Sequence, residues 1–392
     1  MPSMAKVIAA GGIMDDYFLQ ISKTYGMVFR VFLWNNVFVI VLDPECIKDV
    51  LVTGNHQKSK RIYSRLTNLF GTRFLGQGLE AQIDNKHWVV QRKHFDQWFK
   101  PHYVRQFASE FNEFANQFTE YLNTYADGKT EIHTLDTFNK LTMHLLYKVA
   151  FNVDMGPLLG ENHPFVTKMK TALLGISVSN KNPFVAKSCY NWYFLNSYLT
   201  GQETSASTMS CMLFLLGQNP GCYKRLQIEI DENVGAVSVI TLNELEKLPY
   251  LDMVLKETLR LYPVAKATFR ETASDYNLGG HLIPGGTDMF VSFYATSRSE
   301  QNVRNPTEFL PERFHSDSSE SFSKYASTPF SAGPHTCIGR KFAEIEMKIM
   351  IAKIIQNFDF ELIPGQTCEL TDSVTLFPKD GVKCFFRQRK TA

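Results

Sequence analysis

One cysteine in a glycine-punctuated loop is the residue of this 392-residue chain best suited to chemistry. The loop is Phe330-Ser331-Ala332-Gly333-Pro334-His335-Thr336-Cys337-Ile338-Gly339. Apolar residues then recur at steps of three and four, which predicts a helix with one buried stripe made by Ile338, Phe342, Ile345, Ile349 and Ala352. Cys337 would therefore lie at a helix N-terminus, where unpaired N–H groups and the helix dipole favour the thiolate, the form that binds metals.

The residues around this cysteine favour a metal ligand. A lone cysteine is more often a small buried hydrophobic residue. The loop resembles the haem-binding loop of the cytochrome P-450 family, Phe-x-x-Gly-x-Arg-x-Cys-x-Gly, whose thiolate ligates haem iron. Phe330, Gly333, Cys337 and Gly339 match this pattern. The glycines suit tight turns or a flat ligand, and Phe330 would cover the sulfur. His335 replaces the usual arginine; it can donate a hydrogen bond to a haem propionate, but its charge near neutral pH is conditional.

Further cationic and aromatic positions match the family's propionate-binding residues. Trp88 and Arg92 are four residues apart and therefore share one face of a predicted helix. The resemblance implies that they hold propionates together with Arg270 and His335, since buried carboxylates need cationic or N–H donors. Taken alone, the Trp88 and Arg92 pair fits a solvated helix equally well.

An acid and an alcohol lie side by side within the long apolar stretch 190–218, which predicts one helix. Thr200-Gly201-Gln202-Glu203-Thr204 resembles the family's oxygen-activation motif, Ala/Gly-Gly-x-Asp/Glu-Thr. Oxygen activation needs protons, and an acid beside an alcohol in a locally opened helix can relay them. Thr204 can bond back to the carbonyl of Thr200 and distort the helix. Such a pair is more often structural than catalytic, but its position upstream of the cysteine loop favours Glu203 and Thr204 as a proton relay.

A second set of charged residues has a structural interpretation. Glu257 and Arg260 match the family's Glu-x-x-Arg, and Arg313 lies in the segment 309–314. The resemblance implies that the three form a buried ion-pair triad. Breaking a buried pair costs about 3–5 kcal/mol because the surviving charge is stranded, so we expect these residues to stabilise the fold.

The remaining patterns predict a mainly α fold with small β-sheets. Helices are expected at 15–25, after Asp43-Pro44-Glu45, at 107–121 and 138–151, and at 248–261 behind the capping box Thr241-Leu242-Asn243-Glu244. Strands are expected at 27–32 and 37–42 as a hairpin, after 284–287, and in the tail from 358. The segment 60–79 has no clean period and is expected to be a loop.

At 392 residues the chain could form one large domain or two, and its 44% hydrophobic residues and 31 phenylalanines fit a globular interior. The resemblance implies a single domain spanning 1–392. The net charge of +2 is too small to indicate nucleic acid. Seven scattered cysteines without zinc-type spacing favour a reducing compartment over a disulfide framework. We expect no membrane anchor, because no run of 18 apolar residues occurs. The resemblance implies the endoplasmic reticulum membrane, and the chain as written a cytoplasmic or peripheral location.

One region is shorter than the resemblance predicts. Between 177 and 190 the family inserts helices that roof the substrate pocket, whereas this chain has a single short connection. At the usual helix length of about 11 residues, two or more helices would be missing. Their loss would expose aromatic side chains such as Trp192 and Phe194. We therefore expect a deletion near 177–190, in a truncated isoform or an incomplete gene sequence.

Within the family, the chain is most similar to the sterol side-chain hydroxylases typified by cholesterol 24-hydroxylase. The segments that carry this resemblance are 70–79, 201–206 and 362–366. It implies a monooxygenase that holds haem b through Cys337, takes electrons from NADPH through a separate flavoprotein reductase, and hydroxylates a sterol-like lipid. The implied pocket residues are Tyr63, Leu66, Phe74, Ala265 and Thr375. A lysine at position 266 would be costly beside a sterol unless it reaches water.

Two other functions stay open at this point. A truncated chain could be a non-catalytic member that binds haem poorly or binds only partner proteins. A thiolate haem isomerase that uses peroxides would need no reductase, but Glu203 and Thr204 argue against it. A basic face with Lys93, His94 and Lys100 fits either an acidic electron-transfer partner or ordinary solvation.

Overall fold

The computed structural model describes residues 12–33, 36–67, 77–153, 198–372 and 375–389. Helices predominate, as predicted. They are α2 (Met14–Tyr25), α3 (Pro44–Lys48), α4 (Lys60–Thr67), α5 (Asn85–Trp98), α6 (Pro101–Val104), α7 (Ala108–Tyr125), α8 (Thr134–Phe151), α10 (Tyr198–Gln218), α11 (Pro220–Asn233), α12 (Leu242–Glu246), α13 (Pro249–Leu261), α14 (Phe293–Arg298) and α15 (Arg340–Asn357). The strands are β1 (Val28–Leu33), β2 (Asn36–Val41), β3 (Gln57–Lys58), β4 (Ile132–His133), β5 (Ala267–Glu271), β6 (Tyr276–Leu278), β7 (His281–Ile283), β8 (Asp288–Ser292), β9 (Phe358–Leu362), β10 (Leu370–Asp372), β11 (Leu376–Pro378) and β12 (Lys383–Gln388).

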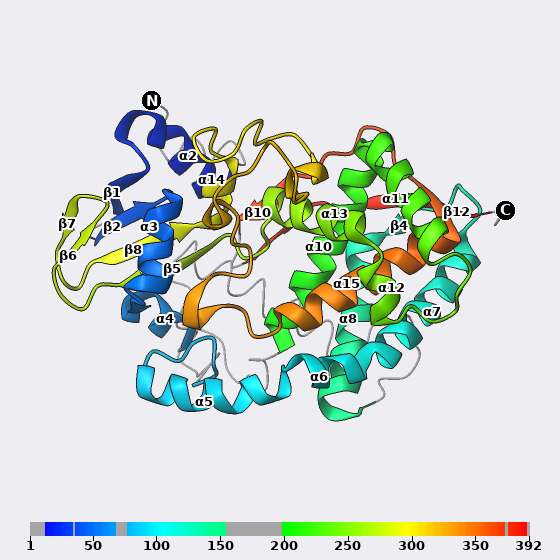
Figure 1. Ribbon diagram of the computed structural model, residues 1–392, viewed down its shortest axis with the longest axis horizontal. Helices are drawn as coiled ribbons and strands as arrows, with labels where there is room; N and C mark the ends of the chain where they lie inside the picture. Colours follow the sequence, from blue (N-terminus) through cyan, green and yellow to red (C-terminus); the bar gives the residue numbers. More distant parts are fainter. Residues whose placement is uncertain (1–11, 34–35, 68–76, 154–197, 373–374, 390–392) are drawn as a thin grey trace, which may run out of the picture.

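The largest sheet has five strands in the order β1-β2-β8-β5-β3. β1 and β2 form the predicted antiparallel hairpin, and β2 pairs with β8 in parallel. Every residue of the central strand β8 is buried, in part because α2 packs against the sheet. The sheet lies on one side of the molecule, and α7, α8, α10, α11, α12, α13 and α15 lie on the other (Figure 1). These helices share one large hydrophobic core.

Local capping signals start two helices where the sequence predicted them. The Asp43 carboxylate accepts a hydrogen bond from the Cys46 N–H at 2.8 Å, and Pro44 opens α3. Thr241 and Glu244 form the capping box of α12. Such contacts satisfy N–H groups that have no partner inside the helix. The helices predicted at 15–25 and 248–261 are α2 and α13, and those at 107–121 and 138–151 belong to the longer α7 and α8.

The predicted loop at 60–79 is wrong in its first part, which forms α4. The Ser59 hydroxyl accepts a hydrogen bond from the Ile62 N–H at 3.2 Å. Tyr63 is buried, and its hydroxyl lies 3.2 Å from that of Thr268 on β5. This helix lacks a clean sequence period and is held by tertiary contacts, which supply most helical stability in proteins.

The structure bears on two further expectations, the deletion and the membrane anchor, only within its described residues. The predicted deletion near 177–190 lies outside the described residues. Within the described residues, no helix has the length and the apolar character needed to cross a bilayer.

The predicted ion-pair triad is present and fully buried. Arg260 Nε and Arg313 Nε lie 2.7 Å and 3.0 Å from the two carboxylate oxygens of Glu257, and all three side chains are 0% exposed. Arg260 also donates hydrogen bonds to the carbonyl oxygens of Ser297 at 2.9 Å and Pro306 at 2.7 Å. The triad therefore joins α13 to α14 and to the segment that carries Arg313.

Replacing Arg260 by alanine should lower the free energy of unfolding by about 3–5 kcal/mol, because the Glu257 carboxylate would lose a partner while staying buried. The matched control is Arg387→Ala, which removes an exposed pair with Glu361 and should cost about 1 kcal/mol or less. Denaturant titration measures both losses. Equal losses for the two variants would contradict a structural role for the triad.

Candidate active site

The cysteine loop is held by its own backbone before α15 begins. The Cys337 N–H donates a hydrogen bond to the Phe330 carbonyl at 2.8 Å, and the Thr336 hydroxyl donates to the Ser331 carbonyl at 3.2 Å. Gly333 has a φ of +70°, and a Cβ there would overlap the backbone of Leu51. The sequence predicted that Gly333 serves a tight turn or the close approach of a flat ligand. The structure shows the turn, and the backbone of Leu51 is the group that lies close to Gly333.

The Cys337 thiol is accessible on one side and enclosed by protein on the others. Its side chain is exposed, so Phe330 does not cover it as expected; the Phe330 ring lies 5.4 Å from the Arg340 guanidinium. Burial by the surrounding atoms raises the pKa of the thiol, while a hydrogen bond from the Gly339 N–H lowers it. Helix α15 starts at Arg340, two residues later than predicted, and the Gly339 N–H at its N-cap favours the Cys337 thiolate.

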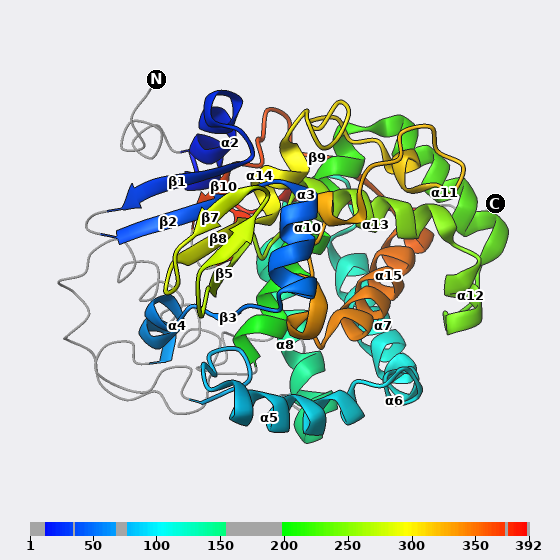
Figure 2. The same ribbon diagram turned by 60° about the vertical axis from the view of Figure 1, so that its left-hand side comes forward.

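Helix α5 brings Trp88 and Arg92 to the cysteine loop, as predicted. Both views show α5 below the start of α15 (Figures 1 and 2). The Trp88 and His335 rings have centroids 3.9 Å apart. Arg92 donates a hydrogen bond to the Thr336 carbonyl at 2.7 Å and pairs with Asp96 at 2.8 Å. Arg92 therefore fixes the loop in addition to contributing positive charge.

Strands β3 and β5 contribute two more cations to the same place. Arg270, which was predicted, and Lys58, which was not, are directly opposite each other in the antiparallel pair. Opposed like charges on a sheet are destabilising. Lys58 Nζ donates hydrogen bonds to the carbonyls of Leu79 at 2.8 Å and Glu80 at 2.5 Å. Burial, with the nearby Arg270 and Arg92 charges, lowers the pKa of Lys58 to about 8.

This basic cluster, made by Lys58, Arg92, Arg270 and His335, is short of negative charge. Burial and the three neighbouring cations lower the pKa of His335 to about 3, so its ring is neutral near pH 7, not conditionally charged as expected. Arg270 Nε and His335 Nδ1 are buried without hydrogen-bond partners. Buried polar atoms normally have partners, so an anionic ligand fits here. These donors would hold the carboxylates of haem, and Cys337 would supply the sulfur ligand to its iron.

Replacing His335 by arginine should strengthen haem binding roughly tenfold or more, because a charge-assisted hydrogen bond contributes about 1.5–3 kcal/mol. The same change should lower the thermal midpoint of the haem-free chain, since the new charge would face Lys58, Arg92 and Arg270. Haem titration followed by Soret absorbance, repeated from about pH 6 to 8, measures the affinity. His335→Gln is the neutral control and should show no gain; identical affinities for all three proteins would contradict the assignment.

Helix α10 places the predicted relay residues beside a strand of the C-terminal region. Glu203 is 9% exposed and Thr204 is half-buried. The Thr375 hydroxyl donates a hydrogen bond to Glu203 Oε2 at 2.8 Å. Burial raises the pKa of Glu203, with the Thr375 bond acting against it. The expected opening of the helix is not observed, because α10 is continuous through Thr204, and Gly201 gives room to Leu146 on α8.

The predicted substrate-pocket residues have different outcomes. Thr375 contacts Glu203, and the Leu376 N–H donates a hydrogen bond to the Val264 carbonyl at 2.8 Å, which brings this strand beside the exposed Ala265. The Tyr63 hydroxyl lies with Thr268 in the basic cluster's neighbourhood. Phe74 and the Leu66 side chain lie outside the described residues.

Lys266 does not face an apolar pocket without a partner, as the sequence suggested it would. Lys266 Nζ lies 3.2 Å from Asp15 Oδ2 on α2, and the Asp15 side chain is fully buried. Ion pairing is how a lysine at a largely buried position is tolerated. Asp15 therefore provides Lys266 with a buried partner.

One acid near the relay was missed by the sequence reasoning. Glu346 on α15 is 2% exposed, and its Oε2 accepts a hydrogen bond from the Ser205 hydroxyl on α10 at 3.1 Å. Its Oε1 is buried without a partner. Burial raises the pKa of Glu346 to about 8. Its position on a helix with an apolar pattern was the available signal, since an acid at a buried helical position needs a partner.

Stability should fall with rising pH because of Glu346. The folded chain keeps this proton up to about pH 8, whereas the ordinary value is 4.5, so over that interval the unfolded chain binds fewer protons. Glu346→Gln should reduce the decline in thermal midpoint between these two pH values. Glu361→Gln, at an exposed acid, is the control and should keep the wild-type slope. A slope unchanged in Glu346→Gln would overturn this assignment.

Comparison with known proteins identifies the family. The family model described as Cytochrome P450 matches residues 2–200 and 194–385. This chain therefore belongs to the cytochrome P450 family. Cytochrome P450 3A13 of Mus musculus is 27% identical over 451 residues, covering 97% of this chain and 87% of that protein. Cytochrome P450 3A15 of Cavia porcellus is 25% identical over 430 residues, covering 92% and 84%.

Similarity is higher over a shorter part of the chain. Cytochrome P450 3A6 of Oryctolagus cuniculus is 40% identical over 162 residues, which cover 41% of this chain and 32% of that protein. Over this shorter, stronger alignment the chain covers about a third of the length of that relative. Members of the family bind haem through a cysteine thiolate and receive NADPH-derived electrons through a reductase. Cys337 and the basic cluster fit that cofactor.

Proposed function

We propose that this chain is a haem-thiolate monooxygenase that inserts one oxygen atom into a C–H bond of an apolar lipid. The observation that carries this proposal is the accessible Cys337 thiol beside a basic cluster with unpartnered donors. When bound, haem supplies the chemistry that activates dioxygen with two electrons. The chain's own residues ligate the iron, neutralise the propionates and manage protons.

Residues of two segments would hold or move protons. Cys337 would ligate the iron as a thiolate, whose charge the Gly339 N–H stabilises. On α10, burial favours the protonated form of Glu203, and the Thr375 hydroxyl holds the orientation of its carboxyl group. Glu203 can therefore release a proton toward the reacting centre with Thr204 and be reprotonated, which is general acid catalysis.

The substrate assignment is a sterol-like lipid, as in cholesterol 24-hydroxylase. It is supported by the segments 201–206 and 362–366. The ion pair with Asp15 also compensates the positive charge of Lys266, which would otherwise disfavour an apolar substrate. The names of the relatives reported above carry no substrate. Conversion of cholesterol by the purified chain with reductase and NADPH tests this assignment, with a fatty acid as the competing substrate.

The electron donor would bind the face formed by α5 and the cysteine loop. A groove of about 600 Å³ lies there, lined by Trp88, Val89, Arg92, Lys93, Asp96, Gln97, Lys100, Gly333 and Pro334. Cations outnumber acids in this lining, which suits an acidic protein surface. We propose an NADPH-dependent flavoprotein reductase as the partner, and the endoplasmic reticulum membrane, by family resemblance, as the location.

A deletion in the substrate-roof region is also part of this proposal. Support comes from the family match, which falls into two segments that meet at 194–200. The alignment with cytochrome P450 3A13 also runs over 451 residues, more than the 392 of this chain. A compact monomer that turns over substrate would contradict a damaging deletion. Aggregation or a haem-free product would favour the alternative, a catalytically impaired haem- or partner-binding protein.

The carbon monoxide difference spectrum of the dithionite-reduced protein tests thiolate ligation directly. A strongly red-shifted Soret band should appear in the wild type and be lost in Cys337→Ser, because serine cannot supply a thiolate. Cys222→Ser, at a half-buried cysteine outside the site, should keep the band. A red-shifted band that persists in Cys337→Ser would remove the basis of the proposal.

Glu203→Gln should lower turnover about a hundredfold, the lower end of what a general acid contributes, while the carbon monoxide spectrum stays unchanged. Thr375→Val should cause a smaller loss of turnover, because it removes only the hydroxyl that orients Glu203. NADPH consumption and product are measured together, so that electrons lost to side reactions are counted. Full, coupled turnover in Glu203→Gln would show that another group delivers the proton.

A further inference from the structure

The part of α10 that carries the relay pair is built from residues that favour helices poorly. The ten residues 201–210 include one glycine, two threonines and three serines, all weaker helix formers than alanine or leucine. The Thr208 hydroxyl also donates a hydrogen bond back to the Thr204 carbonyl at 2.8 Å, a contact that tends to bend helices. The helix is nevertheless continuous here, so contacts from other elements must support it.

Two side-chain hydrogen bonds hold this turn of α10 from opposite sides. Glu203 accepts one from Thr375 at 2.8 Å, and the Ser205 hydroxyl donates one to Glu346 Oε2 on α15 at 3.1 Å. Successive residues of a helix point about 100° apart, so Glu203 and Ser205 project in nearly opposite directions and Thr204 projects between them. The two bonds together therefore set the direction in which Thr204 points.

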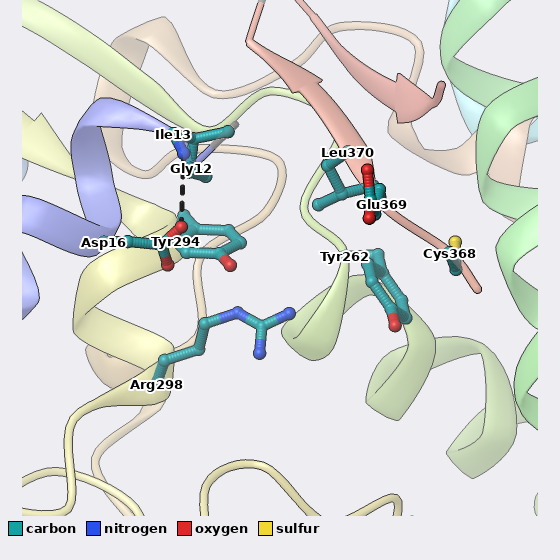
Figure 3. Close-up of a pocket in the computed structure, with 9 residues that line it drawn as sticks. All are labelled: Gly12, Ile13, Asp16, Tyr262, Tyr294, Arg298, Cys368, Glu369 and Leu370. Carbon is teal, nitrogen blue, oxygen red and sulfur yellow. Dashed lines mark hydrogen bonds between the residues drawn. The ribbon is translucent and has the colours of Figure 1, made fainter. Parts of the chain in front are cut away.

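The elements that supply these two bonds are not packed equally. Thr375 directly precedes β11, and the β10–β11 hairpin borders a cavity of about 290 Å³. Figure 3 shows Leu370 of β10 on one side of this cavity and Tyr294 of α14 on the other. Glu346 belongs to α15, and the next residue, Met347, is part of the largest hydrophobic core. The bond from α15 is therefore the more firmly supported of the two.

Glu346 is an unusual residue for this buried place. It is 2% exposed, and its Oε1 has no hydrogen-bond partner. Burial raises the pKa of this carboxyl to about 8, and among the described residues only the Ser205 hydroxyl acts against that effect. A buried acid without a compensating charge is unfavourable for stability, and sequences depart from such rules mainly at functional sites. The acid therefore has a use that an apolar residue could not serve.

The position of Glu346 along α15 relates it to the proposed iron ligand. Helix α15 begins at Arg340, three residues after Cys337. Glu346 follows six residues later, which is about 9 Å along the helix axis. The bond between Ser205 and Glu346 thus joins the helix that starts behind the thiol to the helix that carries the relay pair.

We propose that Glu346 is a positioning residue for the relay: its hydrogen bond with Ser205 holds this turn of α10 in place and fixes the direction of Thr204. Glu346 acts only through Ser205 and touches neither substrate nor cofactor. The effect on turnover rests on the proposed monooxygenase function. The effect on α10 belongs to the polypeptide and can be measured without turnover.

The test uses Ser205→Ala, Glu346→Leu and the double variant in the purified full-length chain. Amide hydrogen exchange at residues 203–208 reports how often this turn opens, and product formed per NADPH consumed reports the relay. Each single variant should exchange roughly threefold to tenfold faster and lose product per NADPH by a similar factor, as expected for one lost hydrogen bond. The double variant should be no worse than either single variant, because both remove the same interaction.

A conservative variant and a matched control separate positioning from packing. Glu346→Gln keeps an oxygen that accepts the Ser205 hydrogen bond, so its exchange and its product per NADPH should stay close to those of the wild type. Ser207→Ala is the control on the same helix, because Ser207 is buried and its hydroxyl has no partner; it should change neither quantity. Circular dichroism confirms that each variant is folded, and Ser205→Ala against Ser207→Ala decides the matter if Glu346→Leu does not fold.

Three results would overturn the proposal. The first is wild-type exchange in both Ser205→Ala and Glu346→Leu. The second is exchange in Glu346→Gln as fast as in Glu346→Leu. The third is faster exchange in the single variants with unchanged product per NADPH, which would leave Glu346 a purely structural role. A wild type that turns over no substrate would contradict the proposed function instead, and the exchange rates would still decide whether Glu346 holds α10.

Discussion

Positive charge gathered beside one thiol is the constraint on which the functional part of this structure depends. Lys58 and Arg270 face each other across a strand pair, and Arg92 and His335 approach from a helix and a loop. Their mutual repulsion, added to burial, is unfavourable in the polypeptide alone. An anionic cofactor would relieve this repulsion, and the relief would contribute to its binding affinity. The same donors would then hold the propionates close to the Cys337 sulfur.

Helix α10 is joined to remote segments of the chain by two side-chain hydrogen bonds. Glu203 accepts one from Thr375, and Ser205 donates one to Glu346 on α15. Each contact joins α10 to a segment more than a hundred residues away in sequence. Helix α10 is packed along much of its length in the largest core. A change at one of these contacts would therefore affect the whole helix and not one side chain alone.

Sequence reasoning succeeded where a local pattern has a local physical cause. The caps at Asp43 and Thr241 satisfy N–H groups of their own helices, and periodic apolar residues predicted α2, α7, α8 and α13. It failed for α4, which lacks a clean period and is held by Tyr63 against β5. It also predicted a local opening of α10 at Thr204, which the continuous helix does not show.

The sequence by itself determined the cysteine loop and the acid and alcohol pair, because fixed spacing within short motifs specifies which groups occur together. The triad of Glu257, Arg260 and Arg313 was implied by the resemblance to the family. Only the tertiary structure decided which charges lack partners. The register of β3 and β5 places Lys58 in the basic cluster, and Lys266 forms an ion pair with Asp15. Burial and the neighbouring cations lower the pKa of His335, so its ring is neutral. Such outcomes depend on distance and desolvation, and both are set by packing between segments that are remote in the chain.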